Sequence, residues 1–216
     1  TGLHGRAGLD AIGAELRREG SGHRLSGASS FVVSGHVADL LVVAARAPGS
    51  RGPEGVSLVT LPASTAGVQI ERLVMMDSTR TCAQIVFDRA HVVSEQVLGE
   101  GGSAGAAFER TLHLAQIALA AEQAGGAEGA LDMTVAYAKE RVQFGRVIGS
   151  FQAVKHRLAD MMVAIEAAKS AVYYAAATAD EHGAELPQAA ALAKAYCSDA
   201  FTDCAGNAIQ LHGGIG

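Results

Sequence analysis

Residues 138–161 decide the fold of this chain and read Ala-Lys-Glu-Arg-Val-Gln-Phe-Gly-Arg-Val-Ile-Gly-Ser-Phe-Gln-Ala-Val-Lys-His-Arg-Leu-Ala-Asp-Met. On both sides of this stretch apolar residues recur every three or four positions, which is the period of a helix with one buried face. Gly145 and Gly149 interrupt the pattern, and Ser150 is placed to cap the helix that follows. The stretch therefore predicts the end of one long helix, a short connection and the start of another.

Two arginines, Arg141 and Arg146, stand at this predicted corner beside Phe144 and Gln152. A helix C-terminus favours a nearby cation, so a solvated capping arginine explains either residue taken alone. Taken one by one, these residues therefore indicate a helix end and assign no ligand.

Downstream of residue 103 the chain is rich in alanine and keeps the helical period. We expect three helices at about 104–140, 151–182 and 187–212, with Pro187 in the first turn of the third, where proline is tolerated. Short connections between amphipathic helices predict an antiparallel bundle.

Upstream of this half, residues 1–98 show short runs with β-branched residues separated by glycine- and proline-containing turns. The runs lie at 14–17, 31–33, 40–43, 56–59, 83–87 and 92–93. Short strands at this spacing predict an antiparallel β-sandwich or barrel. Residues 99–103, Gly-Glu-Gly-Gly-Ser, are the expected hinge. The predicted class is α+β, with an antiparallel β domain over 1–98 and a helical bundle domain over 104–216.

Composition narrows the possible partners. The 216 residues are 49% hydrophobic, yet no uninterrupted apolar run is long enough to span a bilayer, and no charged leader opens the chain. A net charge of -5 argues against binding to a nucleic-acid backbone. The three cysteines, Cys82, Cys197 and Cys204, lack metal-ligand spacing, and we expect reduced, buried thiols.

The corner pattern is more specific than its parts. Arg-x-x-Phe-Gly-x-x-Ile-x-x-Phe-Gln-x-x-Lys-His-x-Leu-Ala-Asp-Met, which starts at Arg141, closely resembles the helix-turn-helix signature of the acyl-CoA dehydrogenase family. Residues 27–39 resemble the strand and turn that run along the flavin ring in that family, and residues 86–102 resemble the exit of its middle β domain. The resemblance implies a middle β domain and most of a C-terminal helical domain, without the N-terminal helical domain and the segment after Gly216.

The resemblance also implies cofactor-binding residues. In the family, the residues that match Arg141, Phe144 and Gln152 bind the adenine-dinucleotide arm of an FAD held by a neighbouring subunit. The second motif, Gln-Leu-His-Gly-Gly-Ile-Gly at 210–216, resembles the family's other contact with that arm, through Gln210, Gly213 and Gly214. Taken alone, a Gly-Gly-x-Gly after a helix is explained as well by a helix cap and a flexible loop.

Two positions depart from the family pattern. On the strand that would run along the flavin, Phe31 fills the first aromatic position, but Val33 stands where the family has a hydroxyl that bonds the reactive flavin nitrogen. Valine cannot donate that bond, and on a strand Ser34 is predicted to point to the opposite face.

The catalytic base is the other departure. The family's usual carboxylate would lie beyond Gly216, and a minority position matches Ala115. Glu109 and Glu122 do not coincide with it and are expected on solvated helix faces. No catalytic or metal-binding residue is assigned.

The resemblance implies an oxidoreductase of fatty acid metabolism, an FAD-dependent acyl-CoA dehydrogenase. Such an enzyme removes the α and β hydrogens of an acyl-CoA thioester and passes electrons to an electron-transfer flavoprotein. Two alternatives stay open: a non-catalytic partner subunit of a heteromeric acyl-CoA dehydrogenase, and a flavoprotein similar to acyl-CoA oxidases. The implied assembly is a homo- or hetero-tetramer, in a bacterial cytoplasm or a mitochondrial matrix.

Overall fold

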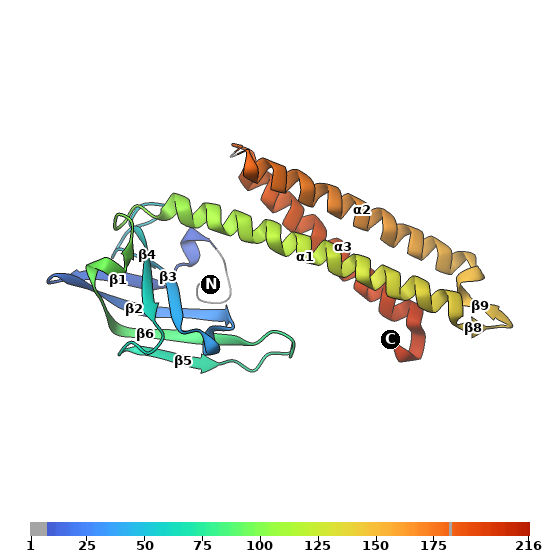
Figure 1. The fold of residues 1–216 in the computed structure, drawn as a ribbon, viewed down its shortest axis with the longest axis horizontal. Coiled ribbons are helices and arrows are strands. Elements are labelled where there is room, and N and C mark those ends of the chain that lie inside the picture. The colour runs from blue at the N-terminus through green and yellow to red at the C-terminus, as the bar shows by residue number, and fades with distance from the viewer. Residues whose placement is uncertain (1–7, 182) are drawn as a thin grey trace. The chain divides into compact units, whose positions relative to one another are not determined.

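The computed structural model describes residues 8–181 and 183–216, which form a strand-rich part and a helical part (Figure 1). The last strand before the helices ends at Leu98, and the first long helix starts at Gly105. The change from strands to helices therefore falls where the sequence predicts it. The chain forms two compact units, and the boundary between them falls between Leu112 and His113, inside the first long helix. The first eight residues of that helix therefore belong to the strand-rich unit.

Seven strands of the first unit form one sheet. They are β1 (Ala14–Glu19), β2 (Gly22–Val33), β3 (Leu40–Arg46), β4 (Val56–Pro62), β5 (Val68–Arg72), β6 (Cys82–Val92) and β7 (Val97–Leu98), in the order β5-β6-β2-β1-β3-β4-β7. Five neighbouring pairs are antiparallel, whereas β1 and β3 pair in parallel at Glu15 and Arg46. The α+β class is confirmed. The strands differ from a two-sheet sandwich because all seven belong to one mixed sheet.

Alternating residues of the strands build one core. Leu16 and Leu25 pack with Leu61 of β4 and Phe87 of β6 in a single buried cluster. Strands from both halves of the sheet share this cluster, so the sheet curves around its own core. The period-2 alternation of apolar residues puts these side chains on its inner face.

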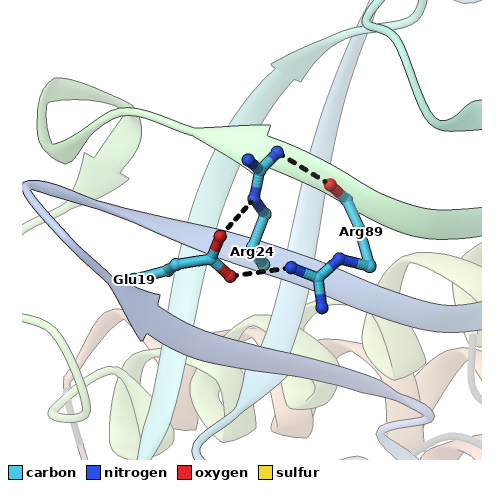
Figure 2. A network of polar contacts seen from close by, with 3 residues as sticks. All are labelled: Glu19, Arg24 and Arg89. Atoms are coloured by element: carbon cyan, nitrogen blue, oxygen red, sulfur yellow. Dashed lines mark hydrogen bonds and ion pairs between the residues drawn. The ribbon is translucent and has the colours of Figure 1, made fainter.

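A β-bulge interrupts β6. Leu25 pairs with Ala90 and Gly27 with Phe87, so β6 carries an extra residue here, and Arg89 has a φ of 50°. Figure 2 shows the Glu19 carboxylate between two guanidinium groups, 3.3 Å from Nε of Arg24 and 2.9 Å from Nη2 of Arg89. Arg24 also donates to the Arg89 carbonyl at 3.2 Å. All three side chains are partly exposed, so the network fixes the bulge more than it adds stability.

Some strands of this sheet were not predicted from the sequence. β5 was not predicted, although Val68-Gln-Ile-Glu-Arg72 alternates apolar and polar residues. The first part of β2 was missed because its glycines and serines resemble a loop. The run at 92–93 is not a separate strand, since Val92 ends β6.

Three helices follow: α1 (Gly105–Glu140), α2 (Gln152–Asp180) and α3 (Leu186–His212). Their bounds confirm the predicted helices to within two residues. Their buried residues are mostly alanine, and one cluster joins Ala120 of α1, Ala168 of α2 and Ala193 of α3, as expected of a bundle. Between α1 and α3 the approach is close at Gly126, where a Cβ atom would lie 2.9 Å from the Phe201 ring.

The three cysteines are thiols in the cores of the two units. Cys82, Cys197 and Cys204 are buried and free of disulfides, as the sequence predicts. Burial raises the pKa of the Cys197 and Cys204 thiols. Within the described part of the chain, no helix has the length and apolar character needed to cross a membrane.

Candidate functional site

The corner after α1 is a β-hairpin rather than a simple connection. β8 (Val142–Gln143) pairs antiparallel with β9 (Arg146–Val147), and Phe144 and Gly145 form the two-residue turn between them. Both turn residues have positive φ, 55° and 76°, as a type I′ turn demands. A bulky side chain rarely adopts this backbone, and such strain is found most often where a site uses the residue.

Three of the predicted cofactor-binding residues lie on this corner. Arg141 follows the last residue of α1; its N–H donates to the Tyr137 carbonyl at 2.9 Å, and its own carbonyl accepts from the Ile148 N–H at 2.8 Å. Phe144 occupies the tip of the hairpin, 92% exposed. Gln152 is the first residue of α2 and is exposed. The backbone of the corner is thus held by hydrogen bonds, while all three side chains face solvent.

An aromatic residue that sequence reasoning did not assign organises the hairpin. The ring of Phe151, half-buried just before α2, meets the Phe144 ring edge to face, with centroids 6.2 Å apart. On the same ring stacks the guanidinium of Arg146, 4.0 Å from the centroid. The signal for Phe151 was present in the Phe-Gln dipeptide of the family signature.

One local prediction was wrong. Ser150 does not cap α2, because the N-cap residue is Phe151 and no side chain caps the helix. The Ser150 hydroxyl donates instead to the Val147 carbonyl at 2.7 Å and so closes the short turn before the helix. Gly149 fits this turn tightly, since a Cβ atom there would lie 2.8 Å from the Ala138 carbonyl oxygen.

The glycine motif lies at the same end of the helical unit. Tyr137, one turn before Arg141, donates from its hydroxyl to the His212 carbonyl at 3.3 Å. The two rings stack with centroids 4.4 Å apart, and Nδ1 of His212 lies 2.7 Å from the Ala208 carbonyl oxygen. This contact fastens the end of α3 to the last turn of α1. Sequence reasoning missed Tyr137, which an aromatic one turn before the corner could have signalled.

The remaining predicted residues of this motif are exposed. Gln210 lies on the last turn of α3, and Gly213 ends the helix with a φ of 66°. Cβ atoms built on Gly213 and Gly214 would meet nothing within 4 Å. The backbone here is open to approach from outside the chain, while the Tyr137–His212 contact fixes where it stands.

The end of β2 presents the other predicted residues. Phe31 sits in a second β-bulge: Ser29 pairs with Ile85 and Val32 with Ala83, and Phe31 has a φ of 57°. The exposed fractions of Phe31 and Val33 are 41% and 60%. Both predicted side chains therefore face outward from the core of the first unit.

Ser34 lies outside the strand on which the sequence places it. β2 ends at Val33, and Ser34 has a φ of 56°, outside the strand. Strand alternation therefore does not fix the direction of the Ser34 side chain, contrary to the prediction that it points to the opposite face.

A cavity of about 180 Å³ lies in the first unit. Its walls are mostly apolar and include Val32 of β2, Val43 of β3, Phe87 of β6, and Phe108 and Leu112 of α1. Phe31 and Val33 do not line it, although Val32 between them does.

The charges around the corner are unbalanced. Among residues 8–181 and 183–216, neither Arg141 nor Arg146 forms an ion pair with a carboxylate. Glu109 and Glu122 are exposed on α1, in agreement with the prediction. No group of three metal-ligating side chains occurs in the part of the chain that the structure describes. The corner between α1 and α2 carries the guanidinium groups of Arg141 and Arg146 and the rings of Phe144 and Phe151. Cations and aromatic rings together suit an anionic, aromatic ligand.

Comparisons with known proteins agree on one family. The family described as "Acyl-CoA dehydrogenase, C-terminal domain" matches residues 104–216. The caffeyl-CoA reductase-Etf complex subunit CarC of Acetobacterium woodii is 33% identical over 214 residues, which are 97% of this chain and 56% of the relative.

Two solved structures extend the likeness to both units. Butyryl-CoA dehydrogenase from Megasphaera elsdenii gives a TM-score of 0.89 with 32% identity, covering 98% of this chain and 56% of that one. A structure described as PigA with FAD and proline gives a TM-score of 0.91 with 29% identity, covering 99% of this chain and 56% of that one. The chain spans about half the length of the curated relatives it matches.

Proposed function

Because the chain belongs to the acyl-CoA dehydrogenase family, we propose that it acts within an FAD-dependent acyl-CoA dehydrogenase that passes electrons to an electron-transfer flavoprotein. The relative from Acetobacterium woodii is named as a subunit of a complex with such a flavoprotein, which supports that choice of electron acceptor. The structure described with FAD supports the choice of cofactor. The proposed substrate is an acyl-CoA thioester.

One observation carries the proposal: the last turn of α1, which leads into the hairpin, is in contact with the end of α3, which leads into the glycine segment. The Tyr137 hydroxyl donates to the His212 carbonyl at 3.3 Å, so Arg141 and Gly213 each follow closely on a residue of this contact. These residues fit the adenine-dinucleotide arm of FAD. A guanidinium suits the pyrophosphate, the 92%-exposed Phe144 ring offers a packing surface, and open glycine backbone allows close approach.

Each group has a proposed role at this surface. Arg141 binds a phosphate oxygen, Phe144 packs against the arm, and Gln152 and Gln210 donate or accept hydrogen bonds. Gly213 and Gly214 bring backbone N–H groups close to the arm. At the end of β2, Phe31 and Val33 line the face of the flavin ring. FAD, when bound, supplies the acceptor for the β hydride after a carboxylate base removes the α proton.

The decisive experiment uses the protein expressed from its complete gene. We expect the purified protein to show the absorption of oxidised flavin, and acyl-CoA thioesters to bleach it without oxygen. Electron-transfer flavoprotein should then restore the spectrum. Rapid recovery with oxygen alone would favour an acyl-CoA oxidase instead, and a protein that binds no flavin would overturn the proposal.

Val33 favours a second candidate function, a partner subunit without an active flavin site. A valine cannot donate a hydrogen bond to the flavin, so a subunit of this kind would lend its corner to the FAD of a neighbour. Such a subunit co-purifies with a second, homologous chain, and the flavin-to-chain ratio is one FAD for every two chains. One FAD per chain in a pure homo-oligomer rules this candidate out.

The remaining proposals concern the oligomeric state, the domain bounds, the cellular compartment and the pathway. An FAD arm bound across subunits requires an oligomer, and we propose a tetramer, to be measured by light scattering. The functional domains are proposed as 1–98 and 104–216. The proposed compartment is a bacterial cytoplasm or a mitochondrial matrix, and the proposed pathway is fatty acid metabolism.

A further inference from the structure

The two arginines of the corner lie close together at the start of the hairpin. Gln143 pairs with Arg146 and Val142 with Val147, and the Arg141 carbonyl accepts from the Ile148 N–H. Arg141 stands directly before β8 and Arg146 opens β9, so the bond to Ile148 brings the Arg141 backbone opposite a residue only two positions from Arg146. Both side chains are exposed.

Neither arginine of the corner has a carboxylate partner. No carboxylate within the described ranges, 8–181 and 183–216, forms an ion pair with either arginine. Both positive charges are therefore available to an anionic ligand. A phosphate that contacts both guanidinium groups would neutralise them.

The contact with Phe151 prepares Arg146 for such an anion. The central carbon of its guanidinium lies over the Phe151 ring, 4.0 Å from the centroid. The guanidinium carries five N–H donors, and the side chain is otherwise exposed. The ring therefore restricts the position of the group while solvent-exposed donors are left for a phosphate.

We infer that Arg146 is a second phosphate-binding residue, which clamps the pyrophosphate of the FAD arm together with Arg141. This inference rests on the proposed function and adds a residue to its site. Phe151 is the positioning residue, because it orients the guanidinium without touching the phosphate.

The test is the affinity of the Arg146→Gln protein for FAD, measured by fluorescence titration of apoprotein from the complete gene. Loss of one charge-assisted phosphate contact should weaken FAD binding about tenfold to a hundredfold. Arg146→Lys keeps the charge and loses the planar fork, so its affinity for FAD should lie between those of the wild-type protein and Arg146→Gln. Arg157→Gln removes an exposed arginine from α2 and serves as the matched control, with unchanged affinity.

Riboflavin, which has no phosphate, separates binding from support of the fold. A phosphate contact predicts that Arg146→Gln weakens FAD and leaves riboflavin affinity alone, whereas a purely structural role predicts that both fall together. If Arg146→Gln binds FAD like wild type while Arg141→Gln does not, the inference is wrong and the proposed function stands. If the wild-type protein binds no FAD, both are wrong.

Discussion

The end of β2 and the β8–β9 hairpin each hold a phenylalanine in left-handed backbone, Phe31 with φ 57° and Phe144 with φ 55°. Their chemical surroundings differ. Phe144 contacts the Phe151 ring, over which the Arg146 guanidinium also lies, whereas Val33, two residues after Phe31, has a side chain that cannot form a hydrogen bond. Both regions keep an unusual backbone shape, but the hairpin carries charged and aromatic side chains, whereas position 33 at the end of β2 carries an apolar one.

The difference shows that backbone shape and hydrogen-bonding chemistry are set by separate residues. At the end of β2 the shape comes from an extra residue opposite β6 and from the Ser34 N–H, which donates to the Thr81 carbonyl at 2.9 Å. Neither feature involves the side chain at 33, so the chemistry there can change while the strand end stays as it is. At the hairpin, by contrast, side chains that support the shape also meet the proposed ligand.

The largest effect is expected for Arg141→Ala. Loss of a charge-assisted contact to phosphate, worth roughly 1.5–3 kcal/mol, should weaken FAD binding about tenfold to a hundredfold. Arg141→Lys should fall between Ala and wild type, because it keeps the charge without the fork. The measurement is a flavin fluorescence titration. A solvated capping arginine would instead change stability by at most about 1 kcal/mol and leave flavin affinity as it was.

The backbone of the corner can be tested at Gly149. A Cβ atom there would lie 2.8 Å from the Ala138 carbonyl oxygen, so Gly149→Ala should destabilise the protein by about 1–3 kcal/mol in urea unfolding. Gly125→Ala is the matched control, since its Cβ would meet nothing within 4 Å. In the middle of α1 that change should stabilise by about 0.5–1 kcal/mol. Equal effects at both sites would show that the corner is not tightly packed.

At the end of β2 the informative change is Val33→Thr. The two side chains have the same shape, and 60% exposure leaves room for a hydroxyl. If the chain carries its own flavin, a restored hydrogen bond worth about 0.5–1.5 kcal/mol should speed reduction by acyl-CoA about two- to tenfold. Stopped-flow absorbance measures this rate. Val33→Ala is the control. If Val33→Thr and Val33→Ala change the rate of flavin reduction to the same extent, the hydroxyl plays no part.

Much of this molecule could be predicted from its sequence, for a physical reason. Helical period depends on neighbours three and four residues away, so α1, α2 and α3 were located to within two residues. β5 and the start of β2 depend on partners distant in sequence, and their glycine, serine and charged residues hide the alternation.

For the candidate site, the sequence supplied candidate residues but not their geometry. The resemblance supplied Arg141, Phe144 and the glycine segment, and these remain predictions as cofactor contacts. The hairpin, the stacking of Arg146 on Phe151 and the bond from Tyr137 were not foreseen, because each depends on side-chain directions that spacing does not encode.

The smallest effect is expected for Tyr137→Phe, which tests how the two halves of the helical site are joined. The change removes the hydroxyl that donates to the His212 carbonyl at 3.3 Å and keeps the stacked ring. A long hydrogen bond at a partly exposed position is worth about 0.5 kcal/mol, so FAD affinity should fall only about twofold.

Tyr137→Ala also removes the ring, and its larger loss measures the stacking contact. The end of α3 would then no longer be held against the last turn of α1, and FAD affinity should fall more than in Tyr137→Phe. Adding Arg141→Ala to Tyr137→Ala gives a double-mutant cycle. Because the tyrosine acts by positioning one half of a shared site, the two losses should be less than additive. Strict additivity would mean that the hairpin and the glycine segment work independently.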